Sequence, residues 1–248
     1  MQKPWPEWWP FPAQPRPLDV RSVNGAPVIA VLAPHPDDFD AIALTLRHFH
    51  RQGADIHLAV LTTGASGVED GYQGATSDAQ KAALREAEQQ ASCAFFGLPA
   101  GRISFLRLPP DADGHLSLDA ASHARIHDFL AACRPQLVFM PHGSDSNVTH
   151  QRTYALFRAV TLAAGWPLWA LLNQDAKTLN IRTDLYLPFD EDDAAWKGEL
   201  LRLHRSQHQR NLNTRGKGFD ARVLEINRKA GVPHGAAYAE LFELERYG

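Results

Sequence analysis

Short apolar runs alternate with amphipathic stretches from residue 27 onward. The first run, "PVIAVLA" at 27–33, is typical of a strand buried on both faces of a sheet. The stretch 40–53 has apolar residues at helical spacing and ends at Gly53, which predicts a helix. The same reasoning predicts strands at 55–64, 102–108, 136–141, 167–173 and 180–188, and helices at 78–97, 117–134, 151–164 and 190–210.

Strand–helix–strand units that follow one another predict an α/β fold with a mostly parallel sheet and right-handed crossovers. A chain of 248 residues is long enough to bury one large core of this kind. We therefore expect a single α/β domain over residues 25–248. In such sheets the active crevice lies at the carboxyl ends of the strands.

Residues 1–24 form a different kind of segment. The stretch "PWPEWWPFPAQPRP" is rich in proline and contains three tryptophans, so it cannot form a helix or a central strand. We interpret it as an extended N-terminal arm. The arm either covers its own domain or makes a subunit contact, because aromatic side chains favour interfaces. A homo-oligomer formed through this arm is therefore one of two expectations.

Composition narrows the class of protein. A net charge of −3 gives no basic surface for nucleic acid, and the one basic cluster, "RSQHQRNLNTRGK" at 205–217, is interpreted as a solvated helix end. The two cysteines cannot build a disulfide framework. The chain has neither an apolar run long enough to span a membrane nor a recognisable secretion signal. A cytoplasmic protein is expected.

Two polar clusters follow predicted strands. "HPDD" ends the first apolar run, and "HGSDSNVTH" follows the strand at 136–141. His35 and Asp38 could both face one metal ion, with Asp37 beside it, and either His150 or His142 could be the third ligand. The alternative is structural, with an aspartate capping the next helix and His35 incidental.

A wider set of motifs resembles one family. "APHPDDFD" resembles the signature of the PIG-L/LmbE-like zinc-dependent deacetylases, whose usual form is (A/P)HPDDE. In chain order, "AVLTTGASG", "REAEQQASCAFFG", "PHGSDSNVTHQRTY", "LRLHRSQ" and "AYAELFEL" are similar to further elements of that family. The resemblance covers most of residues 27–245.

The resemblance implies a fold, an activity and a site. The fold would be a Rossmann-like three-layer sandwich with a mostly parallel sheet. One Zn²⁺ per chain would be held by His35, Asp38 and His150, with Asp37 as general base and Arg85 contacting the substrate. The reaction would remove an N-acetyl group from a GlcNAc-like sugar or sugar conjugate. The nucleophile would be a zinc-bound water, whose pKa the metal lowers toward roughly 7.

The chain departs from the family pattern at two places. Phe39 follows "HPDD" where the family has Glu, and the third-ligand loop, usually H-P-D-H, has Asn147 in place of its first histidine. Asn147 could donate a hydrogen bond to the oxyanion in place of that histidine, or it could simply shape a turn. His142, Asp145 and His234 are rival candidates for the donor.

Contacts to the substrate and two other functions complete the expectations. Glu69 and Asp70, in the loop at 64–78, could bind sugar hydroxyls or belong to a solvated loop, and His142 and Asp145 could also contact the substrate. A second candidate function is a zinc amidase acting on a non-sugar amide. A third is a sugar- or nucleotide-binding module with a degenerate site, although no G-x-G-x-x-G follows the first strand.

Overall fold

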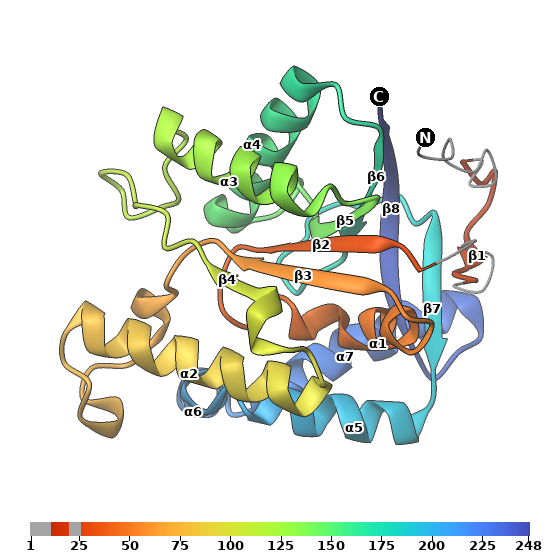
Figure 1. Ribbon diagram of the computed structural model, residues 1–248. Helices are drawn as coiled ribbons and strands as arrows, with labels where there is room; N and C mark the ends of the chain where they lie inside the picture. Colours follow the sequence, from red (N-terminus) through yellow and green to blue (C-terminus); the bar gives the residue numbers. More distant parts are fainter. Residues whose placement is uncertain (1–10, 20–25) are drawn as a thin grey trace.

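The computed structural model describes residues 11–19 and 26–248, and these form an α/β fold around one sheet (Figure 1). In spatial order, the eight strands of the described residues are β1 (Arg16–Pro17), β7 (Leu185–Phe189), β8 (Tyr238–Tyr247), β6 (Leu168–Asn173), β5 (Leu137–Pro141), β2 (Val28–Ala33), β3 (Asp55–Val60) and β4 (Ile103–Phe105). Every neighbouring pair is parallel except the two that involve β8. The expected mostly parallel sheet is therefore confirmed.

Helices cover both faces of the sheet. They are α1 (Ala43–Arg51), α2 (Asp78–Phe96), α3 (Ala120–Cys133), α4 (Val148–Ala164), α5 (Glu191–Arg202), α6 (Arg205–Arg215) and α7 (Phe219–Gly231). In Figure 1, α3 and α4 lie above the sheet and the other helices below it. This is the three-layer sandwich that the family resemblance implies.

The alternation of side chains in β2 explains why both faces are covered. Ile29 and Val31 pack into one apolar cluster with α1 and α2, whereas Ala30 and Leu32 pack into a second cluster with α3 and α4. All four side chains are almost fully buried. Because successive side chains of a strand point to opposite faces, a strand apolar at every position needs a helix layer on each side.

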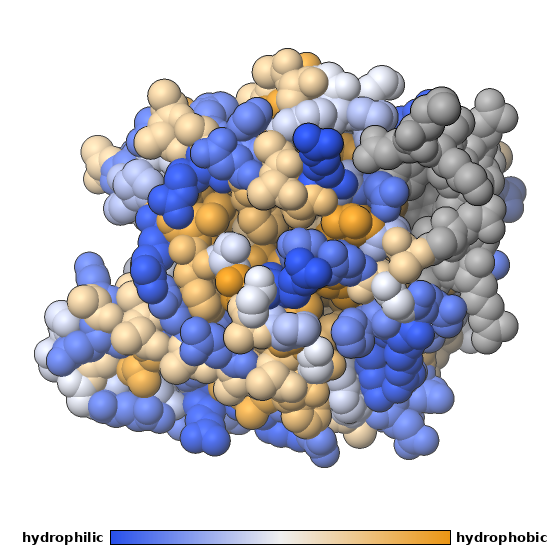
Figure 2. Space-filling model, viewed as in Figure 1, coloured by the Kyte–Doolittle hydropathy of each residue, from blue (hydrophilic) through white to orange (hydrophobic). Residues whose placement is uncertain are grey.

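The order of the strands fixes where a site can form. From β2 the chain passes to β3 on one side of it, and β5 lies on the other side. The connections after β2 and β5 therefore diverge at a topological switch point, where α/β sheets open a crevice at the carboxyl ends of their strands. These ends lie on the left of Figure 1, where the outline of the molecule is indented in the space-filling view (Figure 2).

The C-terminal quarter holds two elements for which the pattern made no prediction. Helix α7 packs on β8, and β8 inserts between β6 and β7, antiparallel to both. The predicted strand at 180–188 proved shorter, since β7 begins at Leu185, and the strand at 102–108 is reduced to Ile103–Phe105. None of the helices in the described part of the chain is long and apolar enough to cross a membrane.

The predicted helix at 190–210 was wrong. The chain turns at Leu203 and His204, which separates α5 from α6. Tertiary contacts make this break: His204 Nε2 lies 2.7 Å from Oδ2 of Asp40, and the Glu88 carboxylate accepts hydrogen bonds from the backbone N–H and the hydroxyl of Ser206, each at 2.7 Å. Glu88 thus supplies the N-terminal cap of α6 from another helix.

The described part of the N-terminal arm lies against its own domain. Arg16 and Pro17 form the edge strand β1, and Leu18 is buried. The Phe11 ring packs 5.5 Å from the ring of Trp169. The three tryptophans of the arm fall outside the described residues, so a subunit contact through them stays a prediction.

Candidate active site

The "HPDD" turn follows β2 and closes on itself. Oδ2 of Asp38 accepts a hydrogen bond from the backbone N–H of His35 at 2.7 Å and lies 3.2 Å from His35 Nδ1. No side chain of the turn caps the helix that follows. Instead, the Glu240 carboxylate of β8 accepts from the first N–H groups of α1. The capping role considered for these aspartates is therefore performed by another residue.

Asp37 has a strained backbone at the centre of this turn. Its φ is 126°, in a region that residues with a Cβ rarely adopt. The Asp37 N–H donates to Oε1 of Gln89 on α2 at 2.9 Å, and this contact helps to hold the conformation. Strain of this kind persists only where surrounding contacts over-determine it, and it is frequent at active sites.

Helix α4 brings a second histidine to the turn. His150 Nε2 lies 3.5 Å from Oδ1 of Asp38, and the rings of His35 and His150 are 5.3 Å apart. One donor atom from each of His35, Asp38 and His150 lies within 4.8 Å of the others. These are the three ligands that the family resemblance implies, and the sheet brings them together from the ends of β2 and β5.

The other ring nitrogen of His150 faces two carboxylates. Nδ1 lies 3.3 Å from Asp145 and 3.5 Å from Asp175. Asp145 is fully buried and also accepts a hydrogen bond from the backbone of Asn147, so it holds the imidazole in place. A carboxylate on the outer nitrogen of a histidine is the usual support for a metal-ligating imidazole. Sequence reasoning missed Asp175, which follows β6.

His150 and the carboxylates around it shift one another's pKa. Burial by itself lowers the pKa of His150, but the carboxylates of Asp38, Asp145 and Asp175 outweigh it and raise that pKa to about 9. Burial by itself raises the pKa of Asp38, yet the charge of His150 and the hydrogen bonds from His35 hold it well below its usual range. Burial raises the pKa of Asp175. The cluster therefore favours the presence of a positive charge.

The donor set fits a divalent metal ion. Two imidazoles and one carboxylate are ligands that Zn²⁺ takes in hydrolytic sites, where it also keeps a position for water. The ligand side chains are only partly buried at His35 and Asp38, which line a cavity of about 930 Å³. A substrate entering this cavity would meet the ligands directly.

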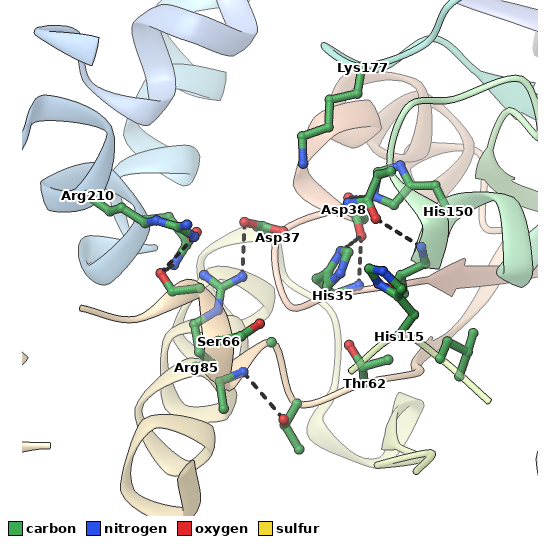
Figure 3. A pocket seen from close by; sticks show the side chains of 18 of the residues that line it. His35, Asp37, Asp38, Thr62, Ser66, Arg85, His115, His150, Lys177 and Arg210 are labelled. Atoms are coloured by element: carbon green, nitrogen blue, oxygen red, sulfur yellow. Dashed lines mark hydrogen bonds and ion pairs between the residues drawn. The ribbon is translucent and has the colours of Figure 1, made fainter. Parts of the chain in front are cut away.

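Arg85 connects Asp37 to helix α2. Its side chain is only 2% exposed, and Nη2 lies 3.0 Å from Oδ2 of Asp37 (Figure 3). The same guanidinium donates to the carbonyl of Pro36 and lies 3.8 Å from Glu88. Gly64 makes room for it, because a Cβ there would meet Pro36 at 2.9 Å and Arg85 at 3.2 Å. Arg85 therefore lines the cavity and also positions Asp37.

Asn147 begins helix α4 at the cavity wall. Its Oδ1 accepts a hydrogen bond from the backbone N–H of Thr149 at 3.0 Å, which makes Asn147 the N-cap. The turn-shaping role weighed for this residue is therefore real, and it leaves the amide NH₂ available as a donor. His115, from the loop after β4, also lines the cavity and was missed by sequence reasoning.

The other predicted site residues lie outside the cavity lining. His142 Nε2 lies 3.1 Å from Glu243, and the ring of His234 stacks on Tyr186. Glu69 accepts a hydrogen bond from Asn213 at 2.7 Å, and Asp70 pairs with Lys81. Asp145 orients His150, as described above. None of these five predicted residues is among those that line the cavity.

Comparison with known families agrees with this geometry. The family model described as PIG-L, GlcNAc-PI de-N-acetylase, matches residues 30–161, more than half of the 248-residue chain. The chain belongs to the PIG-L family. Membership confirms the resemblance read from the motifs and the predicted class of enzyme, an N-deacetylase. A comparison by sequence with curated proteins found no match.

Solved structures with the same fold include enzymes of different specificity. N,N'-diacetylchitobiose deacetylase from Pyrococcus horikoshii superposes on this PIG-L family member with a TM-score of 0.72 and 19% identity, over 89% of this chain and 84% of that one. The zinc-inhibited form of teicoplanin deacetylase Orf2 has a TM-score of 0.65 and 16% identity, over 88% and 98%. GalB, the 4-carboxy-2-hydroxymuconate hydratase from Pseudomonas putida KT2440, has a TM-score of 0.68 and 18% identity, over 88% and 95%.

At these identities the likeness concerns the fold alone. Two of these proteins are named as deacetylases and the third as a hydratase, so the fold does not decide the reaction. The substrate and the roles of single residues must be argued from the site of this family member.

Proposed function

We propose that this protein is a metal-dependent N-deacetylase that hydrolyses the acetamide of a GlcNAc-like sugar or sugar conjugate. One observation carries the proposal: His35, Asp38 and His150 bring donor atoms within 4.8 Å of one another in the lining of a cavity, with Asp37 on the same turn. A metal-ligand triad with a neighbouring carboxylate that does not ligate the metal supplies both the Lewis acid and the general base that amide hydrolysis needs.

His35, Asp38 and His150 would hold one Zn²⁺ per chain. When bound, such an ion supplies Lewis acidity, which polarises the amide carbonyl and acidifies a water molecule. The proposed site residues divide the remaining work. Asp145 keeps the outer nitrogen of His150 engaged, and Arg85 keeps Asp37 directed into the cavity.

Asp37 is proposed as the general base. Arg85 pairs with Oδ2 of Asp37, which leaves Oδ1 as the oxygen that accepts the proton from the attacking water. Attack forms the new C–O bond at the acetyl carbon. The C–N bond then breaks, and Asp37 returns its proton to the leaving amine, so the products are acetate and the free amine.

Asn147 is proposed as the donor that stabilises the oxyanion. Its oxygen is occupied by the N-cap contact with Thr149, so the NH₂ group is the part that can turn toward a substrate in the cavity. Amide donors of this kind stabilise tetrahedral oxyanions in other hydrolases. The chain would thereby replace an imidazole with a group that does not titrate.

An assay of products tests this function. Purified protein, loaded with Zn²⁺ or stripped with EDTA and passed over a desalting column, is incubated with N-acetylglucosamine, diacetylchitobiose and N-acetylated non-sugar amines. Release of acetate and free amine from the sugars by the loaded protein alone supports the proposal. Release only from the non-sugar amides would assign the amidase function instead, and no release from any compound would contradict both. The expected cytoplasmic location stays a prediction.

A further inference from the structure

The wall of the cavity carries four cations besides Arg85 and Arg107. Arg210 and Arg215 come from α6, Arg222 comes from α7, and Lys177 comes from the loop after β6. In Figure 3 Lys177 extends into the cavity from one side, and Arg210 lies on another side. Two of these residues belong to the basic cluster at 205–217, which the sequence alone suggested was a solvated helix end. Both arginines are exposed to solvent as expected, and the fold places them beside the site.

These four cations lack carboxylate partners. Within residues 11–19 and 26–248, none of them forms an ion pair, and Arg210 donates only to the carbonyl of Gly67 at 3.3 Å. The other arginines of the lining differ. Arg85 pairs with Asp37, and Arg107 forms a two-point contact with Glu86 at 2.6 and 2.7 Å.

Carboxylates near the cavity do not cancel this charge. Asp38 and Asp175 face His150, and a bound divalent ion would offset them. Asp78 lies in the first turn of α2, where the helix dipole favours it, and Asp113 lies in the loop after β4. Neither of these two acids pairs with a cation of the wall.

Arg222 lies near charges of both signs. Burial lowers its pKa and the charge of Arg215 lowers it further, whereas the carboxylates of Asp175 and Asp37 act in the opposite direction. The guanidinium is partly buried and lies within electrostatic reach of Asp175, Asp37 and Arg215. Because it forms no ion pair of its own, this guanidinium is available to an anionic ligand in the cavity.

We propose that the substrate carries an oxyanion, a carboxylate or a phosphate, on the amine side of its acetamide, and that Arg222 and Lys177 bind it. This inference rests on the proposed function, because it names the class of acetamide that the site selects. Guanidinium and ammonium groups recognise both oxyanions through charge-assisted hydrogen bonds. Arg210 and Arg215 would add attraction at the cavity wall.

Three substrates on one sugar skeleton test the proposal. They are N-acetylglucosamine, its 6-phosphate and N-acetylglucosaminuronic acid, which carries a carboxylate at the same carbon. With Zn²⁺-loaded protein we expect kcat/KM for at least one anionic sugar to exceed that of the neutral sugar roughly tenfold to a hundredfold, the effect of one hydrogen bond between charged groups. Of the phosphate and the carboxylate, the one that gives the higher kcat/KM is the oxyanion that the site selects. Equal values for all three would overturn the proposal.

Arg222→Gln and Lys177→Gln should each reduce that preference roughly tenfold or more, mainly through KM. Lys217→Gln is the matched control, since it removes the same charge from the loop after α6 but breaks only a pair with Glu225 at 2.8 Å. The preference should survive in this control. If Arg222→Gln and Lys177→Gln keep the wild-type ratio of kcat/KM between the anionic and the neutral sugar, as the control does, the assignment is wrong. If Arg222→Gln fails to fold, Lys177→Gln and the loss of preference in high salt decide the question.

Calorimetry separates this proposal from the deacetylase function. Glucosamine, glucosamine 6-phosphate and glucosaminuronic acid are titrated into the loaded wild type and the variants. Suppose that no acetate is released from any sugar, but glucosamine 6-phosphate binds tightly and this binding is lost in Arg222→Gln. The anion site would then be established, although the proposed reaction fails. If acetate is released but neither phosphate nor carboxylate alters binding, the reaction stands and the anion site is wrong.

Discussion

Nη2 of Arg85 lies 3.0 Å from Oδ2 of Asp37, although 48 positions of chain separate a buried helix residue from the strained turn that it contacts. The contact occupies one oxygen of the carboxylate and leaves the other facing the cavity. It also explains how a residue at φ 126° can be held in one orientation, because the guanidinium binds both the side chain and the carbonyl of Pro36.

Asp37→Asn should separate the general base from the metal ligands. Asparagine keeps the size of the side chain but cannot accept the proton, so we expect kcat to fall on the order of 10²–10⁴-fold with metal content unchanged. Asp38→Asn, by contrast, should weaken metal binding itself. Kinetics and metal analysis on both variants check this. Hydrolysis at the parental rate by Asp37→Asn would mean that another base operates.

Removing a ligand should remove the metal. Asp38→Ala and His150→Ala are expected to lose the one divalent ion per chain, and with it the rise in unfolding free energy of about 2.7 kcal/mol that Zn²⁺ gives at a hundred times its Kd. His142→Ala is the control, because His142 contacts Glu243 outside the cavity lining and should retain the metal. Elemental analysis and thermal unfolding provide the measurements. Full metal content in His150→Ala would refute the ligand assignment.

Substitutions of Asn147 should distinguish capping from catalysis. Asn147→Asp keeps an oxygen for the Thr149 N–H but loses the NH₂ donor, so kcat should fall on the order of 10²-fold while α4 stays capped. Asn147→Ala should lose the same activity and also about 1 kcal/mol of unfolding free energy. If the pH–rate profile has a basic limb near pH 7 and this limb disappears in His115→Ala, that histidine is the oxyanion donor in place of Asn147.

The buried ion pair between Lys197 and Glu240 should be costly to break. Lys197 Nζ lies 2.7 Å from Oε1 of Glu240, and both side chains are almost fully buried. Lys197→Met leaves the Glu240 charge without its partner, which should reduce the unfolding free energy by roughly 3–5 kcal/mol. Adding Glu240→Gln should recover part of that loss. Urea unfolding of the three proteins gives the values, and a loss below 1 kcal/mol in Lys197→Met would show that the pair matters little.

Stability should fall at alkaline pH because of the two thiols. Burial raises the pKa of Cys133 to about 11, and burial together with Asp40 raises that of Cys93 further. In the unfolded chain both thiols ionise near pH 8.5, so above that pH the unfolded state loses protons that the folded state retains. The stabilising contribution is therefore complete below about pH 8.5 and is lost as pH rises through 11. Urea unfolding at pH 7, 9 and 10 should show this loss, and Cys133→Ala should reduce it. Identical pH profiles for the variant and the wild type would contradict the assignment.

The sequence by itself determined the strand–helix alternation, the parallel half of the sheet and the motif that supplies two of the three candidate ligands. These are local properties. An apolar run of seven residues must be buried on both faces, and the polar residues "HPDD" that end it must leave the sheet at its carboxyl edge. His35 and Asp38 therefore share one turn whatever the rest of the chain does.

Only the tertiary structure decided whether His142 or His150 is the candidate third metal ligand, because the two lie eight positions apart around the same loop. The decision depends on β8, because Glu243 of that strand holds His142 away from the cavity while the N-cap at Asn147 directs His150 toward Asp38. The position of β8 between β6 and β7, antiparallel to both, follows from pairing across 49 to 79 residues, which no local pattern encodes.

Long-range packing also explains why sequence reasoning missed several residues of the site. Asp175, His115 and Arg222 carry no motif of their own and become part of one cavity only because the ends of β6 and β4 and the helix α7 converge there. A run of polar residues at 190–210 likewise resembles one helix until His204 meets Asp40 and Ser206 meets Glu88. Side-chain chemistry is local, whereas the packing that brings distant side chains together is a property of the whole fold.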